Sequence, residues 1–184
     1  RMVLNALGMI ETNSIPAGIE AGDAMLKAAD VSLASAQPVC AGKYIVIVSG
    51  SVAAVEAAVA AGVVVAAEVL VDSIVIPNVH EQVIQAIGAC SEVFTTGALG
   101  LIETFSLASA VICADAAVKA ANVNLIEIRL GRGLGGKSFI TMIGEVSAVR
   151  FAVQAAENLE EAKGMVARTV VIPSPHPDML QAIF

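Results

Sequence analysis

The sequence has very few aromatic residues. Its 184 residues include no tryptophan, one tyrosine and five phenylalanines, although 57% of the residues are hydrophobic. Most of the hydrophobic side chains are alanine and valine, which fill space only by close approach, so we expect thin elements that pack tightly on several sides. A chain of this length accommodates one domain or two small ones.

Clusters of basic residues are also missing. The chain has ten Lys and Arg against 17 Asp and Glu, a formal net charge of −7. Nucleic acids and anionic membranes attract clustered Lys and Arg, so we predict neither as a partner. The most hydrophobic stretch, residues 52–71, is about as long as a membrane span, but Glu56 and Glu68 lie within it and argue against that role. No secretory signal is recognised at the N-terminus.

Cysteine is scarce as well, with three residues at positions 40, 90 and 113. An odd number at scattered positions, in a chain without a recognised signal, does not indicate a disulfide framework. We therefore expect a protein of the reducing cytoplasm.

The chain contains an internal repeat. Ala6–Thr12 (Ala-Leu-Gly-Met-Ile-Glu-Thr) returns 92 positions later as Ala98–Thr104 (Ala-Leu-Gly-Leu-Ile-Glu-Thr). Further matches follow in the same order, and the second copy has extra residues in its loops. They pair Asp23 with Asp115, Lys27 with Lys119, Gly42 with Gly136, Lys43 with Lys137 and His80 with His176. A repeat of this length indicates a duplicated structural unit, so we predict two tandem domains, residues 1–94 and 95–184.

Each copy predicts the same order of elements. Apolar runs rich in β-branched residues indicate strands, and the stripe of Val52, Val55 and Val59 indicates a helix. In the first copy we expect strands near 6–11, 31–36, 44–48 and 73–76, and helices near 17–29, after Ser51, and near 79–87. This order predicts an α+β fold, in which a mostly antiparallel four-stranded sheet is flanked by helices in a pattern related to the ferredoxin-like one.

A loop that ends in Gly-Lys precedes the third strand of each copy. The first is Gln37-Pro38-Val39-Cys40-Ala41-Gly42-Lys43, and the second is Arg132-Gly133-Leu134-Gly135-Gly136-Lys137. With Gly131 before it and Ser138 after it, the second loop matches the phosphate-loop pattern. That pattern needs a helix directly after the lysine, whereas residues 139–143 read as a strand. A phosphate-loop nucleotide-binding enzyme is therefore a remote alternative.

Several of these segments together resemble the bacterial microcompartment shell domain. They are the Ala-Leu-Gly-Met-Ile-Glu-Thr start, the helical run Ala-Gly-Asp-Ala-Met-Leu-Lys-Ala-Ala-Asp-Val, the Gly-Lys hairpin, and Ile76-Pro77 with His80. Two such domains in tandem resemble the trimer-forming class. The loop at residues 38–43 and the segment 72–80 are similar to the tandem shell proteins of propanediol-utilisation microcompartments. The unpermuted order of elements fits the simple tandem type.

The resemblance implies a homotrimer that forms a flat, pseudohexameric tile in a polyhedral shell around metabolic enzymes. The hairpin loops of all six domains would surround its centre as pore loops, formed by Val39, Ala41, Gly42, Arg132, Gly133, Leu134, Gly135 and Gly136. Arg132 is expected to add positive charge there. Lys27 and Lys119 are implied to lie on the tile edge and contact neighbouring shell proteins. Each also lies four residues after an aspartate, so we expect the two side chains to share a helix face and to pair.

Cys40 is the candidate metal ligand, because the resemblance implies one 4Fe-4S cluster per trimer on a cysteine of this loop. Threefold symmetry brings one copy of a residue from each chain to the axis, so three Cys40 thiolates would meet there. From the residues alone, the alternative is a small apolar side chain in a packed turn, since no Cys-x-x-Cys companion is present. The tile would then have an open central metabolite pore and no metal.

The other reactive residue types are expected to be structural. Cys90 and Cys113 are interpreted as packing residues. His80 and His176 begin the last helix of each copy and are expected to form hydrogen bonds rather than bind metal. No arrangement of residues indicates an enzyme. We expect a cytoplasmic shell protein that serves electron transfer or cluster delivery across the shell, with an encapsulated or cytosolic redox enzyme as a further partner.

Overall fold

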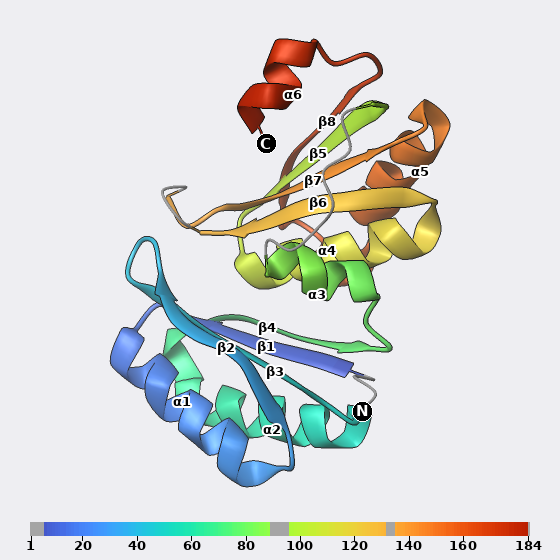
Figure 1. Cartoon of the computed structure of the whole chain (residues 1–184). Helices are drawn as coiled ribbons and strands as arrows, with labels where there is room; N and C mark the ends of the chain where they lie inside the picture. The colour runs from blue at the N-terminus through green and yellow to red at the C-terminus, as the bar shows by residue number, and fades with distance from the viewer. Residues whose placement is uncertain (1–5, 89–95, 132–134, 184) are drawn as a thin grey trace. The chain divides into compact units, whose positions relative to one another are not determined.

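The structure is a computed structural model that describes residues 6–88, 96–131 and 135–183 (Figure 1). The first copy contains β1 (Ala6–Thr12), α1 (Ile15–Ala28), β2 (Ser32–Val39), β3 (Lys43–Gly50), α2 (Val52–Ala66), η1 (Ala67–Val69), β4 (Leu70–Pro77) and α3 (Glu81–Ile87). The second copy contains β5 (Ala98–Thr104), α4 (Leu107–Ala120), β6 (Val123–Leu130), β7 (Ser138–Gly144), α5 (Val146–Glu157), η2 (Glu160–Ala162), β8 (Val166–Ile172) and α6 (Pro177–Ile183). The predicted order of elements is confirmed in both copies.

Each copy builds one four-stranded sheet. The strand orders are β2-β3-β1-β4 and β6-β7-β5-β8, and every pairing is antiparallel. A bulge interrupts the register at the same place in each copy, between Glu11 and Thr12 and between Glu103 and Thr104. The α+β fold predicted from the repeat, with its unpermuted order, is therefore confirmed.

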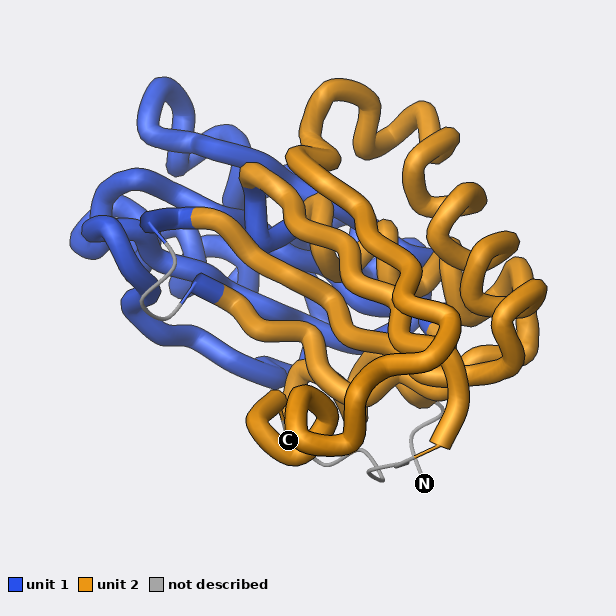
Figure 2. Tube along the Cα trace, turned by 90° about the horizontal axis from the view of Figure 1, so that it is seen from above, with its two compact units in different colours: residues 1–79, 106–108, 131–136 blue, residues 80–105, 109–130, 137–184 orange. Residues whose placement is uncertain are grey.

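The chain forms two compact units that do not follow the repeat strictly (Figure 2). Unit 1 holds the chain up to Val79 together with Ser106–Ala108 and Gly131–Gly136, and unit 2 holds the rest. Helix α3 therefore belongs to unit 2, although it ends the first copy. The predicted join at residues 94 and 95 lies outside the described residues and stays a prediction.

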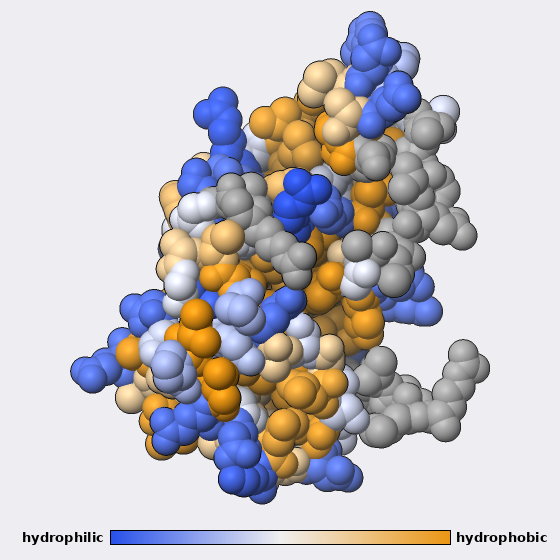
Figure 3. Space-filling model, turned by 60° about the vertical axis from the view of Figure 1, so that its left-hand side comes forward, coloured by the Kyte–Doolittle hydropathy of each residue, from blue (hydrophilic) through white to orange (hydrophobic). Residues whose placement is uncertain are grey.

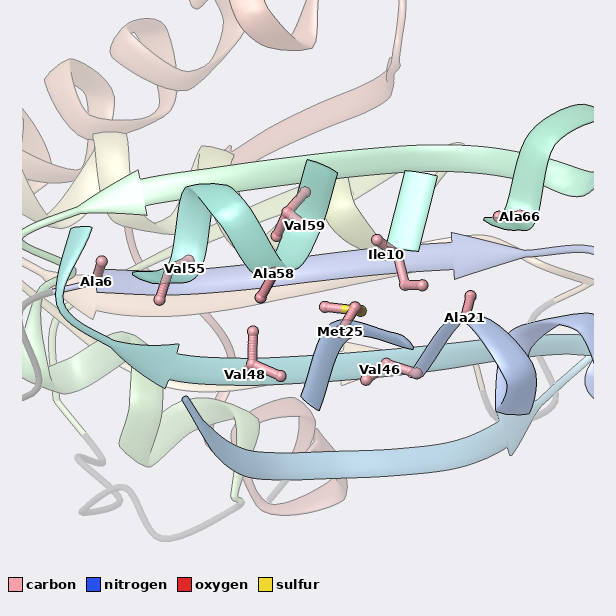
Figure 4. Packing of buried hydrophobic residues seen from close by; sticks show 10 residues of the cluster. All are labelled: Ala6, Ile10, Ala21, Met25, Val46, Val48, Val55, Ala58, Val59 and Ala66. Atoms are coloured by element: carbon pink, nitrogen blue, oxygen red, sulfur yellow. The ribbon is translucent and has the colours of Figure 1, made fainter. Parts of the chain in front are cut away.

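The core of unit 1 lies between its sheet and the helices α1 and α2. Figure 4 shows Ile10 of β1, Met25 of α1, Val48 of β3 and Val59 of α2 pointing into one cluster. Both helices begin at serine caps, since the Ser14 and Ser51 side chains accept backbone N–H bonds from Ala17 and Ala54.

Small residues bring α2 very close to the sheet. A Cβ atom added to Gly8 would lie 2.6 Å from side-chain carbons of both Val55 and Val59, and one added to Gly62 would lie 2.7 Å from Met25 Cγ. Real Cβ atoms do not approach so closely, so these positions accept only glycine without rearrangement. The tight packing expected from the Ala- and Val-rich composition is present.

The segment Val52–Val69 is long and apolar enough to cross a membrane, with a mean hydropathy of 2.0, and 28% of it is buried. The length and composition of one helix are weak evidence for a membrane span, because core helices of soluble proteins can be equally long and apolar. In unit 1, α2 packs against α1, β1 and β4 and buries Val55, Val59 and Gly62.

In unit 2, two short helices cover parts of the sheet. The side-chain amide of Gln82 in α3 donates to the Val123 carbonyl and accepts from the Leu125 N–H, at 3.3 and 2.7 Å. These bonds satisfy backbone groups of the edge strand β6 that have no neighbouring strand. Helix α6 buries Leu180 in a cluster with Leu99 and Ile143 of the sheet.

We predict that Gly8→Ala destabilises the protein, because the added methyl group has no space beside Val55 and Val59. Overpacking of this kind costs about 1–3 kcal/mol in the free energy of unfolding, measured by urea denaturation. Gly50→Ala is the matched control, since the nearest atom to its added Cβ lies 3.4 Å away, and we expect a change within about 0.5 kcal/mol. Equal stability of the two variants would contradict the close approach of α2 to β1.

Candidate functional site

The cysteine loop is the turn of the β2–β3 hairpin. Val39 pairs with Lys43, which leaves Cys40, Ala41 and Gly42 as the three turn residues. Gly42 has a φ of +75°, the left-handed conformation that the last residue of such a turn needs. Ala41 and Gly42 are exposed, and Cys40 is half-buried.

The loop is anchored by residues far away in the sequence. The Cys40 N–H donates to the Gly131 carbonyl at 2.9 Å, and the Lys43 ammonium donates to the Gly136 carbonyl at 3.2 Å. Unit 1 therefore brings together parts of both predicted pore loops, and Gly136 is buried beside Lys43. Arg132, Gly133 and Leu134 lie outside the described residues, while Gly135 is exposed.

A buried ion pair lies behind this loop. The Glu11 side chain is fully buried, and its Oε1 accepts a 2.7 Å bond from the Lys43 ammonium, whose side chain is 15% exposed. Glu11 Oε2 accepts bonds from the backbone N–H groups of Leu107 and Ala108, at 2.8 and 3.3 Å. These N–H groups belong to the first turn of α4, where a helix has unsatisfied donors and a positive dipole end.

The sequence reasoning did not single out Glu11 and Lys43 as a pair. A signal was present, because an acidic residue recurs in an otherwise apolar strand of both copies, and a lysine closes both hairpins. The second copy forms the same pair with less burial. The Lys137 ammonium lies 3.3 Å from Glu103 Oε2, and the two side chains are 43% and 42% exposed.

The phosphate-loop interpretation fails on the structure. Residues Ser138–Gly144, directly after Lys137, form the strand β7 rather than a helix. No helix N-terminus therefore follows this loop to hold a phosphate group.

A single chain does not supply a metal site within the described residues. No group of three or more His, Cys, Asp or Glu side chains lies together in that part of the chain. Cys40 offers one sulfur ligand at a partly exposed hairpin turn, so an iron–sulfur cluster fits only where several copies bring this residue together.

Cys113 has the environment of a packing residue. It lies in α4, is fully buried, and its Sγ approaches the Ala156 carbonyl at 3.9 Å. Burial raises the pKa of the Cys113 thiol to about 12. Its expected packing role is therefore confirmed, whereas Cys90 lies outside the described residues.

The two helix-face lysines pair as expected within their helices. The Lys27 ammonium lies 2.5 Å from Asp23 Oδ2, and the Lys119 ammonium lies 2.5 Å from Asp115 Oδ2. The first pair is exposed, whereas Asp115 is buried and also accepts the His80 backbone N–H at 2.8 Å. The tile-edge role of both lysines stays a prediction.

The two histidines form the hydrogen bonds that were expected of them. His80 Nδ1 accepts the Gln82 N–H, and His176 Nδ1 accepts the Asp178 N–H, each at 3.2 Å. Both therefore satisfy donors in the first turn of a short helix.

Residues 6–79 and 98–175 each match the family model of the BMC domain. The chain belongs to the BMC-domain family. The two matches span the two repeats, so the chain contains two BMC domains in tandem.

Individual members of the family are similar along nearly the whole chain. The bacterial microcompartment shell protein PduT of Citrobacter freundii is 42% identical over 174 residues, which cover 95% of both chains. The crystal structure of a microcompartments protein from Desulfitobacterium hafniense DCB is 50% identical, with a TM-score of 0.86 over 98% of this chain and 99% of that one. The fused permuted shell protein MSM0275 shares only the fold, at 24% identity and a TM-score of 0.59 over 82% and 78% of the two chains.

We predict that Glu11→Ala strongly destabilises this BMC protein, because it leaves the buried Lys43 ammonium without its charged partner and two helix amides without their acceptor. Removing one partner of a buried ion pair costs about 3–5 kcal/mol, measured by urea unfolding. Glu160→Ala is the control, since its pair with Lys163 is 75–78% exposed and is worth at most about 1 kcal/mol. A loss no larger than the control's would show that Glu11 does not anchor this site.

The raised pKa of Cys113 also predicts its reactivity. In a Cys40→Ser, Cys90→Ser double variant, alkylation at pH 8.5 should be very slow, because fewer than about one thiol in a thousand is then ionised. The rate should rise steeply as the pH approaches 12, and alkylation should be complete at pH 8.5 in denaturant. Rapid modification of the folded protein, followed by mass spectrometry, would contradict the burial of this thiol.

Proposed function

We propose that this protein is a structural tile of a bacterial microcompartment shell in the cytoplasm, built as a homotrimer of tandem BMC domains. The observation that carries the proposal is the pair of BMC domains, together with 42% identity to the shell protein PduT over 95% of both chains. Six domains from three chains form one pseudohexagonal tile. The role is that of a wall component rather than of an enzyme.

We further propose that the three Cys40 residues of a trimer, one from each chain, together bind a single 4Fe-4S cluster at its centre. The half-buried Cys40 lies on an exposed turn, and Gly42 and the bond from Cys40 N–H to Gly131 define the conformation of that turn. When bound, such a cluster supplies one-electron transfer, and three thiolates leave one iron without a protein ligand. Cys40 positions the sulfur, and the Glu11–Lys43 pair holds the strand that presents it.

The remaining predicted residues complete this tile. Val39, Ala41, Gly42, Gly135 and Gly136, together with residues 132–134, line the centre as pore loops. Lys27 and Lys119 contact neighbouring shell proteins at the edge. An encapsulated or cytosolic redox enzyme exchanges electrons with the cluster or receives it.

The alternative is a tile whose centre is an open metabolite pore without metal. The small turn residues Ala41 and Gly42 would leave such an opening free, and Arg132 would favour anionic metabolites there. The two forms of the proposal differ in iron content and not in the shell role.

Purification without oxygen separates these alternatives. The cluster form predicts a brown protein with about four iron and four sulfide ions for every three chains, and Cys40→Ser should be colourless and free of iron. Cys113→Ala is the matched control, because the first copy carries Ala21 at the corresponding position, and it should keep the iron.

Two outcomes would count against the cluster. A Cys40→Ser protein that stays brown would refute this ligand, and a parent protein without iron or sulfide would leave the open pore as the better form. Sedimentation of the parent at a mass other than three times 18.6 kDa would contradict the trimeric tile itself.

A further inference from the structure

The loop of the second copy holds the turn of the first hairpin at two points. The Cys40 N–H donates to the Gly131 carbonyl at 2.9 Å. The Lys43 ammonium donates to the Gly136 carbonyl at 3.2 Å. Cys40 begins the turn and Lys43 follows it, so segment 131–136 holds the turn from both sides. Figure 2 shows the ends of this segment in the colour of unit 1, continuous with strands of unit 2.

Gly131 has a backbone conformation that few other residues adopt. Its φ is +67°, in the left-handed region that favours glycine. In the first hairpin Val39 holds the matching place. The residue before each of them pairs with the first residue after the hairpin lysine, Tyr44 in one copy and Ser138 in the other. A valine rarely takes a positive φ, so the second hairpin departs from the first at the residue whose carbonyl accepts the Cys40 N–H.

The space beside the two glycines is limited as well. A Cβ atom added to Gly131 would lie 3.3 Å from Val39 Cβ and 3.2 Å from Leu107 Cδ2. Both neighbours are buried, at 7% and 0% exposure, and have little freedom to move aside. A Cβ atom added to Gly136 would lie 3.4 Å from Lys43 Nζ. A methyl group at Gly131 would therefore press on Val39, and one at Gly136 would contact the ammonium that holds the loop.

We propose that Gly131 and Gly136 are positioning residues for the cluster on Cys40. Their carbonyls fix the backbone on both sides of the turn, so the thiol keeps the same orientation in every chain. Groups that hydrogen-bond to a metal-ligating residue raise metal affinity by restricting its movement. This inference rests on the proposed cluster, and it adds that the second copy, whose own loop has no cysteine, supplies part of the site.

The two hairpin lysines differ in the way this role requires. Lys43 is 15% exposed and also bonds to the buried Glu11. Lys137 is 43% exposed and lies 3.3 Å from Glu103, which is itself 42% exposed. The hairpin that carries the cysteine is therefore the one held by a buried lysine.

Alanine substitutions at the two glycines test the proposal in the full-length protein. Gly131→Ala should lose its iron at about a tenfold lower chelator concentration than the parent, because loss of such an outer bond weakens metal binding about 10–100-fold. Gly136→Ala should act in the same direction with a smaller effect. The electron paramagnetic resonance spectrum of the reduced cluster should change in both variants. Should Gly131→Ala not fold, Gly136→Ala decides the question by the same readouts.

A second measurement does not need the metal. In iron-free protein, alkylation of Cys40 should be at least about threefold faster in both variants, because a turn with weaker anchors exposes its half-buried thiol more often. Figure 3 shows that hydrophobic side chains gather in patches on the molecular surface. A hydrophobic reagent would concentrate there, so the small polar reagent iodoacetamide is the appropriate probe. Mass spectrometry then identifies the modified residue.

Gly164→Ala is the matched control. Gly164 lies on an exposed turn between η2 and β8 and has a φ of +76°. Apart from the adjacent residues, no atom of the described chain lies within 4 Å of a Cβ added there. The control therefore carries similar backbone strain outside both hairpins, and it should keep the iron affinity and alkylation rate of the parent. Circular dichroism and sedimentation establish that each variant is folded and assembles as the parent does.

The outcomes separate this inference from the proposed cluster. Variants at Gly131 and Gly136 that match the control in iron affinity, spectrum and alkylation would overturn the positioning role and leave the cluster intact. Faster alkylation with unchanged iron affinity would also overturn it, because the loop would then hold the turn without affecting the metal. A parent protein without iron would overturn the cluster and this role with it, and the alkylation rates would then show whether segment 131–136 holds the thiol.

Discussion

The buried carboxylate of Glu11 is the constraint on which the surroundings of the cysteine loop depend. A carboxylate in an apolar strand is costly to bury unless charged or polar partners surround it. The Lys43 ammonium and two amides of α4 meet that need. The same lysine reaches the Gly136 carbonyl, so one buried charge connects β1, the hairpin, the start of α4 and the second loop. Cys40 is presented from a turn that these bonds hold in place.

Duplication allows the same elements to be used in two ways. The two sheets share strand order, antiparallel pairing and the position of a bulge, yet matching residues differ in exposure. Asp23 is 60% exposed, whereas its counterpart Asp115 is 7% exposed and binds the His80 backbone. One copy of each contact is thus completed inside the chain, and the other remains on the surface.

The composition explains how such thin units remain stable with so few aromatic residues. Glycines at positions 8 and 62 let α2 lie against β1 and α1, because a Cβ atom at either position would lie 2.6 or 2.7 Å from a neighbouring side-chain carbon. Valine and alanine side chains then fill the narrow space between helix and sheet, as Figure 4 shows for Val55, Ala58 and Val59. A larger side chain at these glycines would separate the layers.

The sequence by itself determined the repeat, the order of elements and the fold class, because strand and helix patterns and turn residues act over a few neighbouring positions. The helix pairs Asp23–Lys27 and Asp115–Lys119 were predictable for the same reason, since four residues make one helical turn. Only the tertiary structure decided that Glu11 meets Leu107, 96 positions away, and that α3 packs with unit 2 rather than with its own copy. Such partners are chosen by long-range packing and by the need to satisfy buried polar groups, which no local pattern encodes.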